Sequence, residues 1–393
     1  MKNILNKNLD LKGKKVLLRV DLNVPMENGA ITETSRIEKI IPTIKLLLEK
    51  QAKIIIISHI GRPKGIVVEK MSLKPISEKL SFLLNKEVFF NKTPINEIAI
   101  SEINKIQNGS IMMLENIRFY KEEETNEIEF SKKLSSLGNI YINDAFSCSH
   151  RSHASVVGVT KHMPSYYGLQ ISEEINALKK ITSEIEKPVS LIIGGSKIST
   201  KIGIIKNLIP KFDNIIIVGG MANSIISFKG NNIGKSIKED NCEIIIKEIF
   251  ETSKKHPCVI TFPEDVLVGK NLDGAAEVKE LNNIKDDDLI LDIGPKTVNK
   301  IKNIIEISKT VLWNGPAGYF ENPNFANGSY EIAKTIIKKN KEKSIYSVVG
   351  GGDTIALINQ INSIQDFNFV STAGGAFLEY LEGKELPGIK ALN

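Results

Sequence analysis

The sequence has little cysteine and no long apolar segment. Its three cysteines stand at positions 148, 242 and 258, an odd number at wide spacings, which argues against a disulfide framework and for a reducing compartment. The longest apolar runs, such as residues 54–57 and 215–218, are far too short to cross a bilayer. Residues 1–15 are basic but lack an apolar core, so no signal peptide is expected. These absences predict a cytoplasmic protein without a membrane partner.

Two frequent nucleotide-binding motifs are missing as well. The stretch "GNNIGKS" at 230–236 is one residue too short for a P-loop, and it follows a segment with helical rather than strand character. The dinucleotide fingerprint G-x-G-x-x-G does not occur. A nucleotide site in this chain would therefore belong to another type of fold.

The net charge of +6 favours an acidic partner. The basic residues are spread along the chain, with no basic tail and no basic stretch interleaved with aromatic residues. Nucleic acid is therefore not an expected partner. A small phosphorylated or carboxylated molecule fits the charge better.

Short apolar segments alternate with amphipathic segments along the chain, which predicts an α/β fold with a parallel sheet covered on both faces. A length of 393 residues favours two domains. The segment "ISEEINALKKITSEIEKP" predicts a helix between the halves, closed by Pro188, and Ser35 is expected to cap the helix "SRIEKIIPTIKLLLEK". Strands are expected in "VLLRVDLNVP", "KIIIISHIG", "SIMMLENIRFY" and "IYINDAF", and in the second half in "LIIGGSKISTKIG", "IIIVGGMANSII", "LILDIGPKT", "TVLWNGPAG", "SVVGGGDTIALI" and "FVSTAGGAFLEYL".

The glycine-rich turns of the second half predict a phosphate site. Ligands of open parallel sheets bind beyond the carboxyl ends of the strands, where glycine allows close approach and helix starts offer free N–H groups. The turn with Gly194 and Gly195 also carries Lys197 and Lys201, whose i,i+4 spacing at a helix start would place two cations on one side. Asp353 follows another glycine turn and is a candidate ligand for phosphate-bound Mg²⁺.

Basic residues follow the expected strands of the first half. Arginine binds phosphate and carboxylate through two parallel hydrogen bonds, so the set predicts a pocket for a small, multiply anionic molecule. Its members are Arg19, Arg36, His59, Arg62, Arg118 and Arg151, together with the acidic Asp21 beside Arg19.

The stretch "NDAFSCSHRSHAS" at 143–155 allows several interpretations. It combines Asp144, Cys148, His150 and His153, which are potential metal ligands or nucleophilic groups. Arg151 stands between the histidines, and a cation there disfavours a metal site. Anion binding is therefore favoured over a structural turn, and both are favoured over metal or cysteine chemistry.

The chain closely resembles phosphoglycerate kinases over residues 10–391. The motifs "RVDLNVP", "SHIGRP", "LENIRFY", "GGSKISTKI", "GGMAN", "LDIGPKT", "LWNGPAGYFE", "GGGDT" and "STAGGAFLEYLEGKELPGI" occur in the family's order. The resemblance implies two Rossmann-like domains joined by a hinge helix. Residues 1–170 would bind 3-phosphoglycerate or 1,3-bisphosphoglycerate, 171–187 would form the hinge, 188–377 would bind nucleotide, and a tail of about 378–393 would fold back onto the first domain.

The resemblance also implies roles for individual residues. The phosphoglycerate side would use Asp21, Asn23, Arg36, His59, Arg62, Arg118 and Arg151. The nucleotide side would use Gly194, Gly195, Lys197, Lys201, Asn314, Pro316, Glu321, Gly350, Gly351, Gly352, Asp353 and Thr354, with Asp353 as the Mg²⁺ ligand. The transfer step would use Arg36, Lys197, Gly374 and Gly375.

The implied reaction is reversible phosphoryl transfer from 1,3-bisphosphoglycerate to Mg·ADP in a monomeric enzyme. Its acceptor in reverse is a carboxylate, already ionised at neutral pH, so no general base is expected. With substrates on separate domains, we expect closure of a cleft to align them and exclude water. The alternative is a non-catalytic two-domain protein that binds an anionic ligand.

Three departures from the family pattern concern the shape of the site. Val218 stands where the family usually has glycine, Ala373 replaces a frequent glycine, and "DAFSCSH" replaces the commoner "DAFGTAH". None of them removes a charged residue of the expected site.

Overall fold

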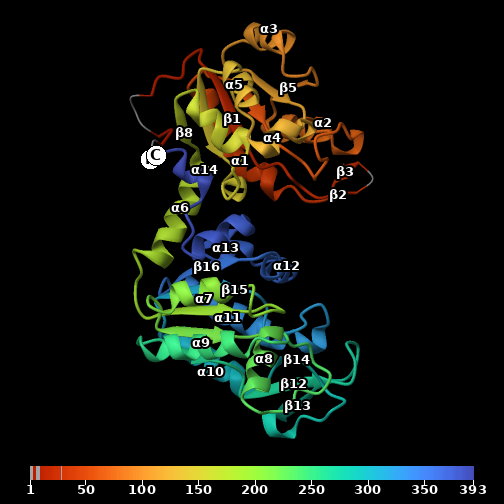
Figure 1. The fold of residues 1–393 in the computed structure, drawn as a ribbon, viewed down its shortest axis with the longest axis vertical. Helices are drawn as coiled ribbons and strands as arrows, with labels where there is room; N and C mark the ends of the chain where they lie inside the picture. Colours follow the sequence, from red (N-terminus) through yellow and green to blue (C-terminus); the bar gives the residue numbers. More distant parts are fainter. Residues whose placement is uncertain (1–2, 6–8, 28) are drawn as a thin grey trace. The chain divides into compact units, whose positions relative to one another are not determined.

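The computed structural model describes residues 3–5, 9–27 and 29–393. The chain forms two compact units (Figure 1): unit 1 comprises Met1–Asn176 and Glu385–Asn393, and unit 2 comprises Ala177–Lys384. The division falls within helix α6 (Leu169–Thr182). The predicted closure of this helix at Pro188 is wrong, because residues 183–188 lead from the helix into strand β9 (Val189–Ile193).

Unit 1 contains a six-stranded sheet in the order β5-β6-β4-β1-β7-β8. All neighbouring strands run parallel, as the sequence predicts. The strands are β1 (Lys15–Val20), β4 (Lys53–Ile57), β5 (Val88–Asn91), β6 (Ile111–Leu114), β7 (Ile140–Asp144) and β8 (Ser165–Tyr167), with a separate hairpin of β2 (Met26–Glu27) and β3 (Ala30–Ile31).

Helices cover both faces of this sheet, because alternate strand residues point to opposite sides. Val16 and Leu18 of β1 pack with α1 (Ser35–Glu49) and α2 (Lys74–Leu84). Leu17 lies on the other face with α3 (Glu97–Lys105) and α5 (Ile128–Ser136). The remaining helices of unit 1 are α4 (Lys121–Thr125) and α14 (Pro387–Lys390).

The start of α1 differs from the prediction. Thr34 is the N-cap residue and makes no side-chain cap hydrogen bond, and Ser35 is already the first helical residue. The Ser35 amide donates to the Glu33 carboxylate. Glu33 thus provides the acceptor that was expected from serine, and the cap prediction for Ser35 is wrong.

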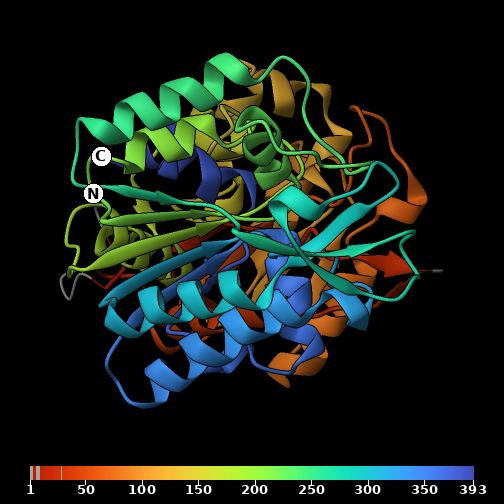
Figure 2. The same cartoon turned by 90° about the horizontal axis from the view of Figure 1, so that it is seen from below.

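Unit 2 contains a second six-stranded parallel sheet, in the order β11-β10-β9-β15-β16-β17. Its other strands are β10 (Asn214–Ile217), β11 (Val259–Thr261), β15 (Thr310–Asn314), β16 (Tyr346–Gly350) and β17 (Phe369–Ser371). Figure 2 shows α9 on one face and α10 and α11 on the other. The helices of unit 2 are α7 (Ile202–Leu208), α8 (Gly220–Phe228), α9 (Glu243–Lys254), α10 (Pro295–Ile307), α11 (Asn327–Lys341), α12 (Gly352–Gln360) and α13 (Gly375–Leu381).

A three-stranded antiparallel sheet in unit 2 was not predicted. It has the order β13-β12-β14, formed by β12 (Asp265–Gly269), β13 (Glu277–Glu280) and β14 (Leu289–Ile293). The segment "LILDIGPKT" therefore forms a strand, as predicted, but in this sheet and not in the parallel one. The predicted α/β class with a parallel sheet in each half is confirmed. Within the described residues, no helix is both long and apolar enough to cross a membrane.

Candidate active site

The basic residues of unit 1 gather at one edge of its sheet. Parallel strands end at the same edge, so the residues that follow them become neighbours. Arg36 comes from the first turn of α1, and Arg118 lies in the 3-10 helix η2 (Ile117–Phe119) after β6. The set that we call the anion cluster comprises Asp21, Asn23, Arg36, His59, Arg62, Arg118 and Arg151.

Short hydrogen bonds tie the anion cluster together. Arg36 forms an ion pair with Asp21. The Gly61 amide donates to Asn23 Oδ1 at 2.9 Å, and the Gly61 carbonyl accepts from Arg118 Nη1 at 2.7 Å. The loops after β1, β4 and β6 are thus joined through Gly61. Exposed Arg62 follows it directly.

Positive charge dominates the cluster. Burial and the nearby Arg19, Arg118 and Arg151 hold the pKa of His59 well below its usual value. Burial, Arg151 and Arg19 also lower the pKa of Arg118, despite a carboxylate of Glu124 at 3.3 Å from its Nε. Such mutual destabilisation of cations suits a site that an anionic ligand neutralises.

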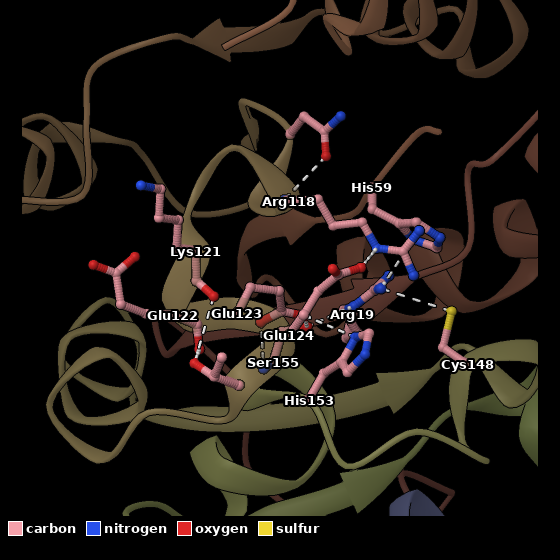
Figure 3. Close-up of polar contacts among 12 residues, drawn as sticks. Arg19, His59, Arg118, Lys121, Glu122, Glu123, Glu124, Cys148, His153 and Ser155 are labelled. Atoms are coloured by element: carbon pink, nitrogen blue, oxygen red, sulfur yellow. Dashed lines mark hydrogen bonds and ion pairs between the residues drawn. The ribbon is translucent and has the colours of Figure 1, made fainter. Parts of the chain in front are cut away.

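Arg19 differs from the other members of the sequence-predicted basic set. It is 1% exposed, and its guanidinium donates to Ser155 Oγ and to the backbone carbonyl of Val20. It also lies 3.0 Å from His59 Nδ1. The expectation that Arg19 lines the pocket is wrong, because its side chain points to the α3/α5 face of β1, where Glu123 and Ser155 provide polar partners (Figure 3).

The metal and cysteine interpretations of residues 143–155 gain little from the geometry. Asp21, His59 and Cys148 offer ligand atoms within 4.8 Å of one another. Asp21 is paired with Arg36, however, and His59 Nδ1 contacts Arg19. A metal ion would have to displace these contacts in a positively charged site. Burial raises the pKa of the Cys148 thiol, which disfavours the nucleophilic thiolate.

Unit 2 contains a cavity of about 290 Å³ beyond the carboxyl ends of its parallel strands. It is lined by residues from the turns after β9, β10 and β15 and by the antiparallel sheet. Of the predicted nucleotide residues, Gly195, Pro316, Glu321 and Asp353 line it.

A second group of predicted residues forms the framework beside this cavity. Lys201 Nζ donates to Asn314 Oδ1 at 2.7 Å, and Asn314 Nδ2 donates to the Gly350 carbonyl at 2.8 Å. Thr354 Oγ1 accepts from the Gly315 amide at 2.7 Å. Burial lowers the pKa of Lys201, while Asp353 and Glu382 oppose this shift.

Glycine is required where two of the turns meet. A Cβ on Gly194 would lie 2.4 Å from the Pro316 carbonyl oxygen, and one on Gly315, at φ +109°, would lie 2.4 Å from the Gly194 oxygen. Gly351 and Gly374 precede α12 and α13 with φ of 97° and 56°. At these glycines the backbone, rather than a side chain, lies at the close contacts between the turns and at the N-termini of α12 and α13.

The helical argument for Lys197 and Lys201 is wrong. Helix α7 begins at Ile202, so both lysines lie in the irregular segment before it and share no helix face. Lys201 is drawn inward by Asn314, whereas Lys197 is exposed. Lys197, Gly352, Gly374 and Gly375 do not line the cavity.

Sequence reasoning missed several lining residues. Asn223 follows the turn of "GGMAN", and Asp292 and Ile290 come from β14. Burial raises the pKa of Asp292 to about 7, although the amides of Gly328 and Ile293 donate to it. Asn223 could have been found from its quoted motif, but the role of β14 depends on pairing that no local pattern reveals.

Two of the three departures from the family pattern lie in unit 2, away from the lining of the cavity. Val218 is fully buried and packs with Ile192 and Ile216. Ala373 is 5% exposed and donates its amide to Ser371 Oγ. Neither side chain lines the cavity.

Comparison with known proteins identifies the family. The model of the family "Phosphoglycerate kinase" matches residues 6–384. A curated phosphoglycerate kinase from Wolbachia pipientis subsp. Culex pipiens is 46% identical and covers 97% of this chain and 97% of its own. The chain belongs to the phosphoglycerate kinase family.

Other relatives agree over almost the full length. The phosphoglycerate kinase of Dictyoglomus turgidum is 45% identical, with 98% of this chain and 96% of the relative covered. The solved structure from Coxiella burnetii has a TM-score of 0.91 at 37% identity and covers 98% and 97% of the two chains. The structure from Pyrococcus horikoshii OT3 has a TM-score of 0.81 at 30% identity, with 100% and 98% covered.

Membership in the family establishes the activity. The protein is a kinase of glycolysis that transfers a phosphoryl group reversibly between 1,3-bisphosphoglycerate and ADP, giving 3-phosphoglycerate and ATP. Its substrates are small molecules, one of them a nucleotide. The alternative of a non-catalytic binding protein is not favoured by these findings.

Proposed function

We propose that the anion cluster of unit 1 binds 3-phosphoglycerate and 1,3-bisphosphoglycerate, and that the cavity of unit 2 binds ADP and ATP. The observation that carries the first assignment is the convergence of several arginines at one sheet edge, where Arg151 and Arg19 lower the pKa of Arg118. Arginine forks suit the phosphate and carboxylate groups of this substrate. The glycine-lined cavity, beside helix starts and Lys201, supports the second assignment.

The predicted nucleotide residues take distinct parts in this proposal. The turn glycines, namely Gly194, Gly195, Gly350, Gly351 and Gly352, let the backbone approach the phosphates. Lys201 neutralises phosphate charge, and Asn314 and Thr354 hold the turns in register. Glu321, in the loop after Pro316, binds the ribose.

Asp353 is the proposed ligand of the Mg²⁺ that accompanies the nucleotide. Its carboxylate is exposed, lies in the first turn of α12 and lines the cavity, and carboxylate oxygen is a ligand type that Mg²⁺ takes. The bound ion neutralises phosphate charge in the substrate. Asp353→Asn should therefore raise the Mg²⁺ concentration needed for half-maximal rate.

The residues proposed to act in transfer are Arg36, Lys197, Gly374 and Gly375. Phosphoryl transfer depends on positioning and on stabilising charge on the migrating group. Arg36 and Lys197 supply that charge, and the N–H groups after Gly374 and Gly375 add donors. No residue is assigned as general base, because the acceptor in ATP consumption is an ionised carboxylate. We propose that the protein acts in the cytoplasm as a monomer.

The test is a coupled assay in which 3-phosphoglycerate and Mg·ATP form an acyl phosphate that drives NADH oxidation. Lys197→Ala should lower kcat by roughly 100-fold, as loss of one transition-state donor does. The exposed Lys206→Ala, on α7, is the matched control. Full activity of Lys197→Ala would remove Lys197 from the proposal.

A further inference from the structure

Arg19 lies directly beside the anion cluster, yet only 1% of its surface is exposed. Its Nε donates to Ser155 Oγ at 3.0 Å, and its Nη2 lies 3.0 Å from His59 Nδ1 and 3.7 Å from Cys148 Sγ. Figure 3 shows these contacts converging on one guanidinium. Its position is therefore fixed from several sides.

Glu123 compensates the buried charge of Arg19. The carboxylate is fully buried on α4 and accepts from the Ser155 amide at 2.9 Å and from Ser155 Oγ at 2.6 Å. Ser155 thus joins the carboxylate to the guanidinium. A buried arginine held in this way cannot swing out to bind a ligand, because its partner charge would be left unpaired in the interior.

The contact between Arg19 and His59 decides where the histidine proton lies. Guanidinium has only donors, so His59 Nδ1 must accept from Arg19 and cannot carry hydrogen. The single ring proton of the neutral imidazole then belongs to Nε2. Among the described residues, no hydrogen bond to Nε2 is found, and 5% of the His59 surface is exposed.

The surroundings keep the ring in this form. The groups that face it are Arg19 on β1, Arg118 in η2, Arg151 and His153 after β7, and Asp21 and Cys148 within ligand distance. Burial and the arginines lower the pKa of His59 well below its usual value, so the ring stays uncharged where histidine normally titrates.

We propose that Arg19 is a positioning residue that fixes His59 as the Nε2–H tautomer, so that His59 meets an anionic group of the phosphoglycerate substrate as a hydrogen-bond donor. The proposal rests on the assignment of His59 to the substrate site. This role explains why Arg19 is buried at the sheet edge although it does not bind the ligand itself. Without Arg19, the ring would be free to present an unprotonated Nε2, which repels phosphate and carboxylate oxygens.

The first test uses the unmodified protein. Long-range ¹H–¹⁵N correlation spectra of ¹⁵N-histidine-labelled protein distinguish the two tautomers and the imidazolium, and a His59→Gln variant assigns the signal among the five histidines. We expect His59 to show protonated Nε2 and unprotonated Nδ1 from pH ~5 to ~8, the range in which histidine ordinarily titrates. A protonated Nδ1 in that range overturns the proposal.

The second test removes the buried pair. Arg19→Met with Glu123→Gln deletes both charges, which buried pairs often tolerate. We expect a mixture of tautomers at His59 and an increase of about tenfold in KM for 3-phosphoglycerate, the size of one hydrogen bond to a charged group, with KM for ATP unchanged. An unchanged tautomer and KM in a folded variant would overturn the positioning role.

The matched control is Lys121→Met with Glu122→Gln. It removes one cation and one anion from the exposed side of α4, the helix that carries Glu123. Glu122 points away from Arg19 (Figure 3). Neither the tautomer nor KM should change. If the tautomer is as expected but His59→Gln leaves KM for 3-phosphoglycerate unaltered, the substrate assignment of His59 fails and the functional part of the proposal fails with it.

Discussion

The two units use the same edge of a parallel sheet in opposite ways. In unit 1 the edge is occupied by charged side chains, several of them buried and held by ion pairs and hydrogen bonds. In unit 2 it is occupied by backbone, with glycines packed against each other at Gly194 and Gly315. The ligand binding proposed for unit 1 therefore depends on individual charged side chains. The binding proposed for unit 2 depends on glycines, whose lack of a side chain lets the backbone come close.

Arg36→Ala tests whether function in unit 1 depends on single charged side chains, and it should have the largest effect. Loss of one donor that stabilises transition-state charge should lower kcat by roughly 10²–10³-fold. The coupled assay measures it, with Lys45→Ala on the exposed face of the same helix as control. A near-normal kcat in a folded Arg36→Ala protein would show that the transfer step does not depend on the charge of Arg36.

Gly194→Ala tests the unit 2 half. The added methyl would lie 2.4 Å from the Pro316 carbonyl oxygen, so the turns after β9 and β15 must separate. A displacement of this kind should reduce kcat/KM for ATP by about 100-fold. Gly352→Ala is the control for stability, because a Cβ there meets nothing within 4 Å. Equal urea midpoints for both variants would argue against close backbone packing at Gly194.

The smallest expected effect is a dependence of stability on pH, which arises from buried carboxyl groups in the two units. Burial raises the pKa of Asp292 in unit 2 to about 7 and that of Asp144 in unit 1 to about 6. A carboxyl whose folded pKa exceeds its unfolded value binds its proton more tightly when folded. Its stabilising contribution is complete below the unfolded pKa and is lost as pH rises through the folded value.

We therefore expect the free energy of unfolding of unit 2 to fall between pH ~4 and ~7 by a few kcal/mol at most through Asp292. The single tryptophan, Trp313, lies buried in β15, so its fluorescence in urea reports on unit 2. The slope with pH should be shallower in Asp292→Asn. An equal slope in both proteins would mean that Asp292 is ionised throughout.

Much of the fold could be predicted because its signals are local. Each parallel strand is a short apolar run followed by a turn and an amphipathic helix, so the sheet of each unit could be expected from periodicity alone. The strand β14 has the same appearance, yet it pairs antiparallel with β12. Pairing is decided by residues far along the chain, and that is why the smaller sheet was missed.

The site shows the same limit. Residues that follow different strands were expected to be neighbours because strand ends meet by geometry, and the contacts of Asn23 and Arg118 with Gly61 agree with this expectation. The burial of Arg19 could not be predicted, since it depends on Glu123 and Ser155, which are distant in sequence and approach only in the folded unit. The lysine pair failed for a local reason: α7 starts one residue after Lys201, and a helix boundary is poorly defined by sequence.

The return of the chain to unit 1 has a consequence for synthesis. The segment Glu385–Asn393 groups with unit 1, where the Gly388 amide donates to the Ser149 carbonyl at 2.8 Å and Leu392 packs with Leu17 and Tyr141. A ribosome must therefore produce all of Ala177–Lys384 before unit 1 receives its last piece. Unit 2 can fold during translation before unit 1 has received Glu385–Asn393. Unit 1, whose synthesis begins first, is therefore completed last.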